Sequence, residues 1–140
     1  MINISPYLSF DGNCEEALNF YQSCFGGDTF LMRFQDGPMK DQFPESQQSL
    51  IMHGEMKNEN FTIMATDMQG PAGHQPGNDM SNILTFDDES LLRKCFALLS
   101  AGGTVLEPVG QQFWGDIFGE LRDKYGKKWK MLLPLNQPNS

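Results

Sequence analysis

The chain has 140 residues, of which 39% are hydrophobic and 11% aromatic, enough to bury the core of one small domain or of two very small ones. Its 18 acidic and 10 basic residues give a net charge of −8, which disfavours nucleic acid and anionic membranes as partners. No apolar run approaches the roughly 20 residues of a membrane span, and the N-terminus has no leader pattern. Three cysteines without CxxC spacing fit a reduced, cytoplasmic protein, in which we expect them to be buried as small apolar side chains.

The first half of the chain begins with a strand pattern and continues with a helix pattern. Residues 4–10 alternate apolar and polar side chains, which predicts a half-buried strand. A helix is expected over 13–25, with Asn13 as its N-cap and with Gly26 and Gly27 at its end. Three further strands are expected, the first two separated by a loop over 36–48: at 28–35, 49–57 and 61–68.

A segment rich in glycine and proline, residues 69–79, predicts a linker. The second half then repeats the order of elements. A strand is expected near 81–87 and a helix near 88–101, ended by another pair of glycines. Three more strands follow, at 104–109, 113–122 and 128–134.

The two halves also match residue by residue. Several positions recur at an offset of 76: Leu8 as Leu84, Phe10 as Phe86, Gly26 as Gly102 and Gly27 as Gly103. The hairpin residues from Gly54 to Asn58 recur from Gly119 to Asp123 at an offset of 65. These matches predict an α+β fold in a single domain over 1–140, built from two βαβββ units at about 1–68 and 80–135. Paired units would form curved mixed sheets around a cleft suited to a small molecule.

Two motifs resemble the PhnB-like branch of the vicinal oxygen chelate superfamily, also called the glyoxalase/bleomycin resistance/dioxygenase superfamily. One runs from Pro6 to Ala17, and the other runs from Phe113 to Gly119 and continues to Trp129. The resemblance covers nearly the whole chain and implies the glyoxalase fold and a homodimer. Members of this branch have carried the name 3-demethylubiquinone-9 3-methyltransferase, but this sequence has no glycine-rich strand–turn–helix element for a methyl-donor nucleotide.

The resemblance also indicates where a metal would bind. Metal-dependent members of the superfamily hold a divalent ion with His, Glu or Gln on the first and last strands of each unit. In this chain those positions fall on residues with other side chains: Ser5, Ser81, Lys130, and Thr62 or Met64. Hydroxyls are weak ligands and an ammonium group repels a cation. We therefore predict no cofactor, and keep a divalent metal at a different site as the alternative.

Three residues are candidates for catalysis. His53 and Glu55 are two residues apart on one predicted strand, so their side chains share a face. They could act in acid–base chemistry or hold a metal, or His53 could be a hydrogen-bonded strand histidine without a catalytic role. Asp116 belongs to the second motif and could join them, or could only form a turn.

Four residues are candidates for ligand binding. Tyr7 and Ser9 share strand parity with Ser5 and should face the cleft, as ligand contacts or as cleft wall. Trp114 could orient a ligand, and Lys130 could pair with an anionic ligand or with an acidic side chain of the protein. The favoured interpretation is a metal-free small-molecule-binding protein. The alternative is an enzyme that uses His53 and neighbouring carboxylates.

Overall fold

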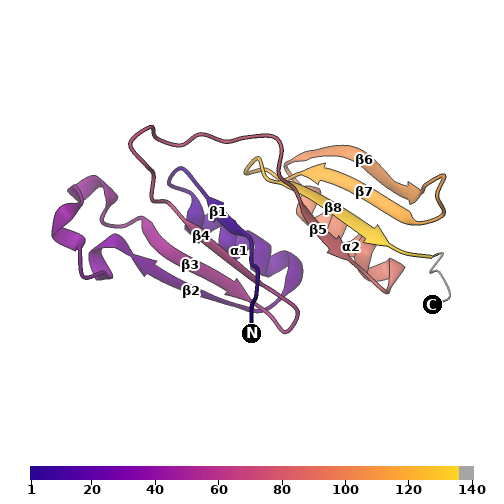
Figure 1. Cartoon of the computed structure of the whole chain (residues 1–140), viewed down its shortest axis with the longest axis horizontal. Coiled ribbons are helices and arrows are strands. Elements are labelled where there is room, and N and C mark those ends of the chain that lie inside the picture. Colours follow the sequence, from indigo (N-terminus) through magenta and orange to yellow (C-terminus); the bar gives the residue numbers. More distant parts are fainter. Residues whose placement is uncertain (136–140) are drawn as a thin grey trace. The chain divides into compact units, whose positions relative to one another are not determined.

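The computed structural model describes residues 1–135, which divide into a first unit, Met1–Pro76, and a second unit that begins at Gly77. Each unit contains one α-helix and one four-stranded mixed sheet (Figure 1). The predicted α+β class is confirmed. Neither of these two helices is long and apolar enough to cross a membrane.

The first unit has the strand order β1-β4-β3-β2, with β1 parallel to β4 and the other pairs antiparallel. Its elements are β1 (Tyr7–Ser9), α1 (Cys14–Phe25), β2 (Asp28–Arg33), β3 (Ile51–Lys57) and β4 (Thr62–Thr66). The expected loop over 36–48 is not wholly irregular, because short 3-10 helices lie between β2 and β3: Phe34–Asp36, Lys40–Gln42 and Glu45–Gln47.

The second unit has the order β5-β8-β7-β6, with β5 parallel to β8. Its elements are β5 (Asn82–Thr85), α2 (Glu89–Ser100), β6 (Thr104–Gln111), β7 (Ile117–Arg122) and β8 (Lys128–Leu133). The strand predicted over 113–122 was wrong at its start. Gly115, at a φ of 104°, donates its N–H to the Gln112 carbonyl, so the chain turns here and β7 begins at Ile117.

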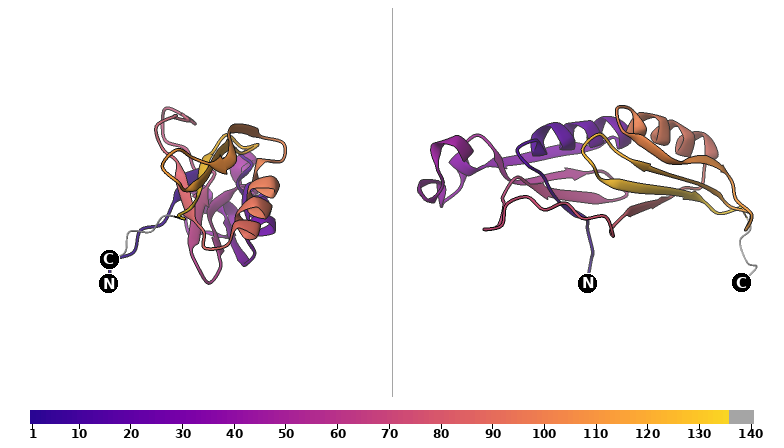
Figure 2. Two further views of the ribbon diagram at one scale, coloured as in Figure 1. Left: turned by 90° about the vertical axis from the view of Figure 1, so that its right-hand side faces the viewer. Right: turned by 90° about the horizontal axis from the view of Figure 1, so that it is seen from above.

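In the first unit, α1 covers one face of the sheet (Figure 2). The buried residues of α1 are spaced at helical intervals: Cys14, Ala17, Leu18, Tyr21 and Cys24. The helix lies so close to β3 that a Cβ built on Gly54 would be 2.6 Å from Leu18 Cδ1. Gly54 therefore faces α1, and the residues on either side of it, His53 and Glu55, face the other way.

We call the sheet surface turned away from α1 the first open face. Strand alternation and register place these residues on it, with others of the same parity: Tyr7, Ser9, Phe30, His53, Glu55 and Met64. The second unit has the same layering, because a Cβ on Gly119 would be 2.9 Å from Phe96 of α2. Its second open face carries Ile83, Thr85, Phe118, Glu120, Lys130 and Leu132.

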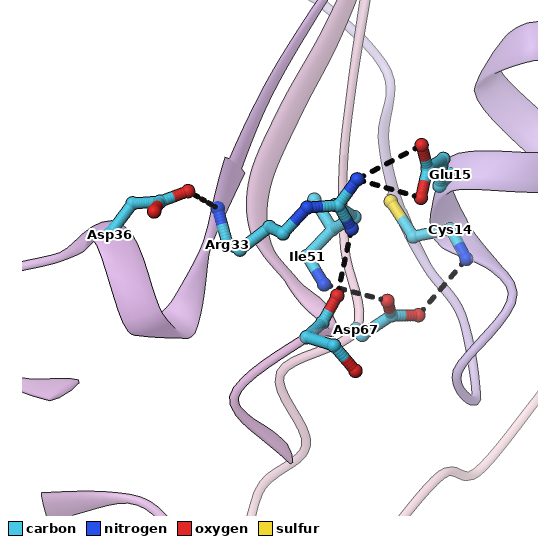
Figure 3. Close-up of polar contacts among 7 residues, drawn as sticks. Cys14, Glu15, Arg33, Asp36, Ile51 and Asp67 are labelled. Atoms are coloured by element: carbon cyan, nitrogen blue, oxygen red, sulfur yellow. Dashed lines mark hydrogen bonds and ion pairs between the residues drawn. The ribbon is translucent and has the colours of Figure 1, made fainter. Parts of the chain in front are cut away.

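A buried carboxylate fixes the start of α1 (Figure 3). Asp67, just after β4, accepts the N–H groups of Gly12 and Cys14 on Oδ1, at 2.9 and 3.1 Å, and that of Ile51 on Oδ2 at 3.0 Å. Asn13 makes no side-chain capping hydrogen bond, so its predicted capping role was wrong. Instead, the side chain of Asp67, more than fifty positions away, accepts the N–H groups of the residues on either side of Asn13, which are Gly12 and Cys14.

Candidate functional site

The first open face brings together three of the predicted site residues, Tyr7, His53 and Glu55. His53 Nε2 donates a hydrogen bond to Glu55 Oε2 at 2.8 Å. The Tyr7 ring lies beside the imidazole, with 6.0 Å between ring centroids and 34° between the ring planes. Ser9 is two residues from Tyr7 on β1 and shares this face. Strands distant in sequence thus place a phenol, an imidazole and a carboxylate on one surface.

The strand register explains this arrangement. Tyr7 on β1 is opposite Met64 on β4, Met64 is opposite Glu55 on β3, and Glu55 is opposite Phe30 on β2. Residues opposite each other in a sheet have Cβ atoms about 5 Å apart. Glu55 therefore has a thioether on one side and an aromatic ring on the other, with His53 next to it along the strand.

This face is partly open to solvent. The side chains of His53 and Glu55 are 28% and 34% exposed, whereas Tyr7 and Phe30 are 55% and 59% exposed. A half-buried carboxylate bonded to an imidazole can accept hydrogen bonds and exchange a proton with a ligand. The surrounding apolar side chains offer contact area to a partly apolar molecule.

Lys130 lies on the second open face and has an acidic partner within its own unit. Its Nζ is 3.9 Å from Glu120 Oε2, across the β7–β8 pair. The structure therefore shows the second of the two arrangements that the sequence allowed for Lys130, pairing with an acidic side chain. A role in ligand binding stays a prediction.

Trp114 and Asp116 lie in the turn between β6 and β7. Trp114 is 46% exposed and packs edge-on against Phe113 and Phe118, at centroid distances of 5.0 and 6.1 Å. Asp116 Oδ1 accepts the N–H of Leu135 at 3.1 Å, and its backbone carbonyl accepts the N–H of Gln112. The carboxylate and the backbone carbonyl of Asp116 therefore take part in local structure, and its catalytic role stays a prediction.

The register also identifies which residues stand where the superfamily would place a metal. Tyr7 pairs with Met64 as Ile83 pairs with Lys130, so Met64, rather than Thr62, is the counterpart of Lys130. A thioether, an ammonium group and the hydroxyls of Ser5 and Ser81 do not fit a divalent ion. Within residues 1–135, no three His, Cys, Asp or Glu side chains are grouped as a metal site.

Three contributors to these faces were not predicted: Phe30, Met64 as a neighbour of Glu55, and Glu120. Strand parity alone could have placed Met64 and Glu120 on the open faces. Phe30 could not have been placed opposite Glu55, because the long segment between β2 and β3 hides their register from any local pattern.

The cysteines are free and buried, as the sequence predicted. Burial raises the pKa of the Cys14 thiol to about 12, and the carboxylates of Asp67 and Glu15 add to the rise. Burial also raises the pKa of Cys95, whereas the charge of Lys94 opposes that rise. Both thiols stay protonated near neutral pH, so neither is an activated nucleophile.

A separate, shallow depression of about 470 Å³ lies among the 3-10 helices of the first unit. Polar residues line it: Gln35, Lys40, Asp41, Glu45, Gln48 and Ser49. The Gln48 amide there donates to the carbonyls of Lys40 and Phe43. None of the predicted site residues lines this depression.

Comparison with known proteins identifies the family. The model of the Glyoxalase/Bleomycin resistance protein/Dioxygenase superfamily matches residues 3–131. Protein YjdN of Escherichia coli is 28% identical, over 96% of this chain and 97% of that protein.

Two solved structures extend the match. Protein PA1353 from Pseudomonas aeruginosa superposes with a TM-score of 0.83 at 32% identity, covering 95% of this chain and 98% of that one. A PhnB protein from Bacillus cereus, whose name proposes 3-demethylubiquinone-9 3-methyltransferase activity, gives a TM-score of 0.72 at 26% identity, covering 95% of this chain and all of that one. This chain therefore belongs to the glyoxalase/bleomycin resistance protein/dioxygenase superfamily and is PhnB-like.

Proposed function

We propose that this protein binds a small, partly apolar molecule on its first open face without a metal ion. The observation that carries the proposal is the surface around Glu55, where a hydrogen-bonded His53–Glu55 pair lies among the side chains of Tyr7, Phe30 and Met64. Large apolar side chains left exposed around a few convergent polar groups are typical of ligand sites.

The donor chemistry supports a metal-free site. The positions that hold the ion in metal-dependent relatives carry Ser5, Met64, Ser81 and Lys130 here. The ammonium group of Lys130 is engaged with Glu120, and it would repel a divalent ion placed beside it. We therefore expect the ligand to contact side chains of the protein directly, without a metal ion between them.

Thermal unfolding tests this proposal directly. Protein stripped with EDTA would be heated with Mg, Mn, Fe(II), Co, Ni or Zn, and separately with a panel of aromatic and aliphatic organic molecules. We expect no shift of the midpoint with any metal and a saturable rise with at least one organic molecule, because a ligand that binds only the native state stabilises it by mass action. A saturable rise with metal alone would contradict the proposal.

The hydrogen bond between His53 and Glu55 favours a second candidate function, an enzyme that performs acid–base chemistry. In such a pair the carboxylate orients the imidazole, which can then take or give a proton. Substituting His53→Ala would abolish turnover of a bound molecule and leave the fold intact if His53 is catalytic. Loss of stability by about 2 kcal/mol instead would show a structural histidine.

We also propose that this protein is a homodimer with a cytoplasmic location. The three free cysteines suit a reducing compartment, and a second sheet would cover apolar side chains that the open faces leave exposed. Light scattering coupled to gel filtration would measure the mass. A monomer at all concentrations would contradict the dimer.

A further inference from the structure

Glu55 and Glu120 occupy corresponding positions in the two units. Each lies in a row of residues that are opposite one another across the four strands of its sheet. The row is Tyr7, Met64, Glu55 and Phe30 in the first unit, and Ile83, Lys130, Glu120 and Glu107 in the second. The same carboxylate thus has two different sets of neighbours.

In the second unit, β8 supplies a permanent cation, because Lys130 is 3.9 Å from Glu120. In the first unit the corresponding residue is Met64, and no lysine or arginine within residues 1–135 lies within ion-pair distance of Glu55. Lys57, the next residue of β3 on this face, lies opposite Asp28. His53 gives Glu55 a hydrogen bond, but it carries a charge only when protonated.

A half-buried carboxylate without a permanent counter-charge is unfavourable next to apolar side chains, and it gains most from a cation that arrives with its own apolar surface. The neighbours of Glu55 suit such a cation. Tyr7 and Phe30 are exposed rings that can attract positive charge through their faces, and Met64 is a polarizable thioether. The net charge of −8 attracts cations to the protein as a whole.

We propose that the ligand of the first open face is an organic ammonium ion, whose N–H groups donate to Glu55 and whose apolar part contacts Tyr7, Phe30 and Met64. This inference rests on the proposed binding function and names its ligand class. It also assigns Met64 a specific role. In this position a methionine leaves the carboxylate available, whereas a lysine, as in the second unit, would occupy it.

Three probes with one apolar part and different head groups test the ligand class: phenylbutylamine, phenylbutanol and phenylbutyrate. Binding would be measured by calorimetry at low salt and near-neutral pH. We expect the amine to bind about tenfold more tightly than the alcohol, and the carboxylic acid to bind most weakly. Equal or tighter binding of the alcohol or the acid would overturn the ammonium proposal and leave the proposed binding function standing.

Matched variants locate the site. Glu55→Gln should reduce the affinity for phenylbutylamine to that of the alcohol, whereas Glu59→Gln, which removes the same charge from the exposed β3–β4 turn, should leave it unchanged. Met64→Lys should remove the preference for the amine by placing a permanent cation beside Glu55. Circular dichroism would check that each variant is folded. An amine preference that survives both Glu55→Gln and Met64→Lys would overturn the assignment.

Failure of the two proposals can be separated. If phenylbutylamine does not bind but a neutral molecule from the wider panel does, the ammonium proposal is wrong and the binding function holds. If neither phenylbutylamine nor any organic molecule of the panel binds, both proposals fail together.

Discussion

The two units share one strand order, but their buried carboxylates lie at positions that do not correspond: at the start of the helix in the first unit and in the last hairpin turn in the second. Asp67 and Asp123 are the acidic side chains buried within residues 1–135, at 5% and 3% exposure. Asp67 fixes the start of α1 in the first unit. Asp123 lies in the β7–β8 turn of the second unit, where it accepts the N–H groups of Tyr125 and Lys127 and the indole N–H of Trp129.

At the two corresponding positions, the start of α2 and the β3–β4 turn, backbone N–H groups are accepted by side chains close by in the sequence. The start of α2 is capped by the adjacent Asp88, which accepts the N–H of Ser90 at 2.9 Å. The β3–β4 turn is held by Asn58, which accepts the N–H groups of Asn60 and Phe61. Strand order therefore does not determine which backbone N–H groups donate to a buried carboxylate. Each unit satisfies one end of its structure with a buried carboxylate and the other with an exposed or neutral side chain.

Among the substitutions that test this comparison, removing the charge of Asp67 should lower the free energy of unfolding most. Asp67→Asn keeps the shape but loses charge-assisted bonds to three backbone N–H groups, and its amide N–H₂ would face one of those donors. We expect the free energy of unfolding to fall by about 3 kcal/mol, measured by urea denaturation. Asp123→Asn should cause a loss of similar size in the second unit. A loss near zero for Asp67→Asn would show that the two carboxylates are not equivalent anchors.

The free energy of unfolding should fall at alkaline pH because of buried cysteines on the helices, Cys14 on α1 and Cys95 on α2. The pKa of Cys14 is raised from 9.0 to about 12 in the folded protein, so the folded state holds a proton that the unfolded state releases. Stability should therefore be independent of this group below pH 9 and should fall above it, by about 1.4 kcal/mol per pH unit between the two values. Thermal unfolding from neutral pH to pH 10 would measure the fall.

Cys14→Ala is the variant that tests the source of this pH dependence. It should flatten the alkaline profile in part and leave the contribution of Cys95, whose pKa is also raised by burial. An unchanged profile in Cys14→Ala would show that other groups cause the loss.

Local patterns predicted the elements that depend on local residues. The helix over 13–25 was predicted within one residue of α1, because its apolar spacing and the two glycines at its end are contained in the segment itself. Strand parity correctly placed His53 and Glu55 on one face. The neighbours of Glu55 depend on pairing between distant strands, and no spacing along the chain records that Phe30 lies opposite it.

The capping prediction failed for the same reason. Asn13 has the right residue type at the right position, and a rule based on adjacent side chains selects it. The side-chain acceptor at the start of α1 is instead Asp67, which takes the N–H groups of Gly12 and Cys14 and is positioned by the pairing of β4 with β1 and β3. Lys130 is a similar case, because its partner Glu120 is set by the β7–β8 register.

The smallest expected effect compares the two helix starts directly. Asp88→Ala removes a local cap that accepts one N–H, so we expect a loss of about 1 kcal/mol in the free energy of unfolding. Asn13→Ala removes a side chain that makes no capping bond, and it should change stability by less than about 0.5 kcal/mol. Urea denaturation of both variants beside the parent protein measures the difference. If Asn13→Ala were the more harmful substitution, the start of α1 would depend on its own N-cap residue, and the long-range role assigned to Asp67 would be wrong.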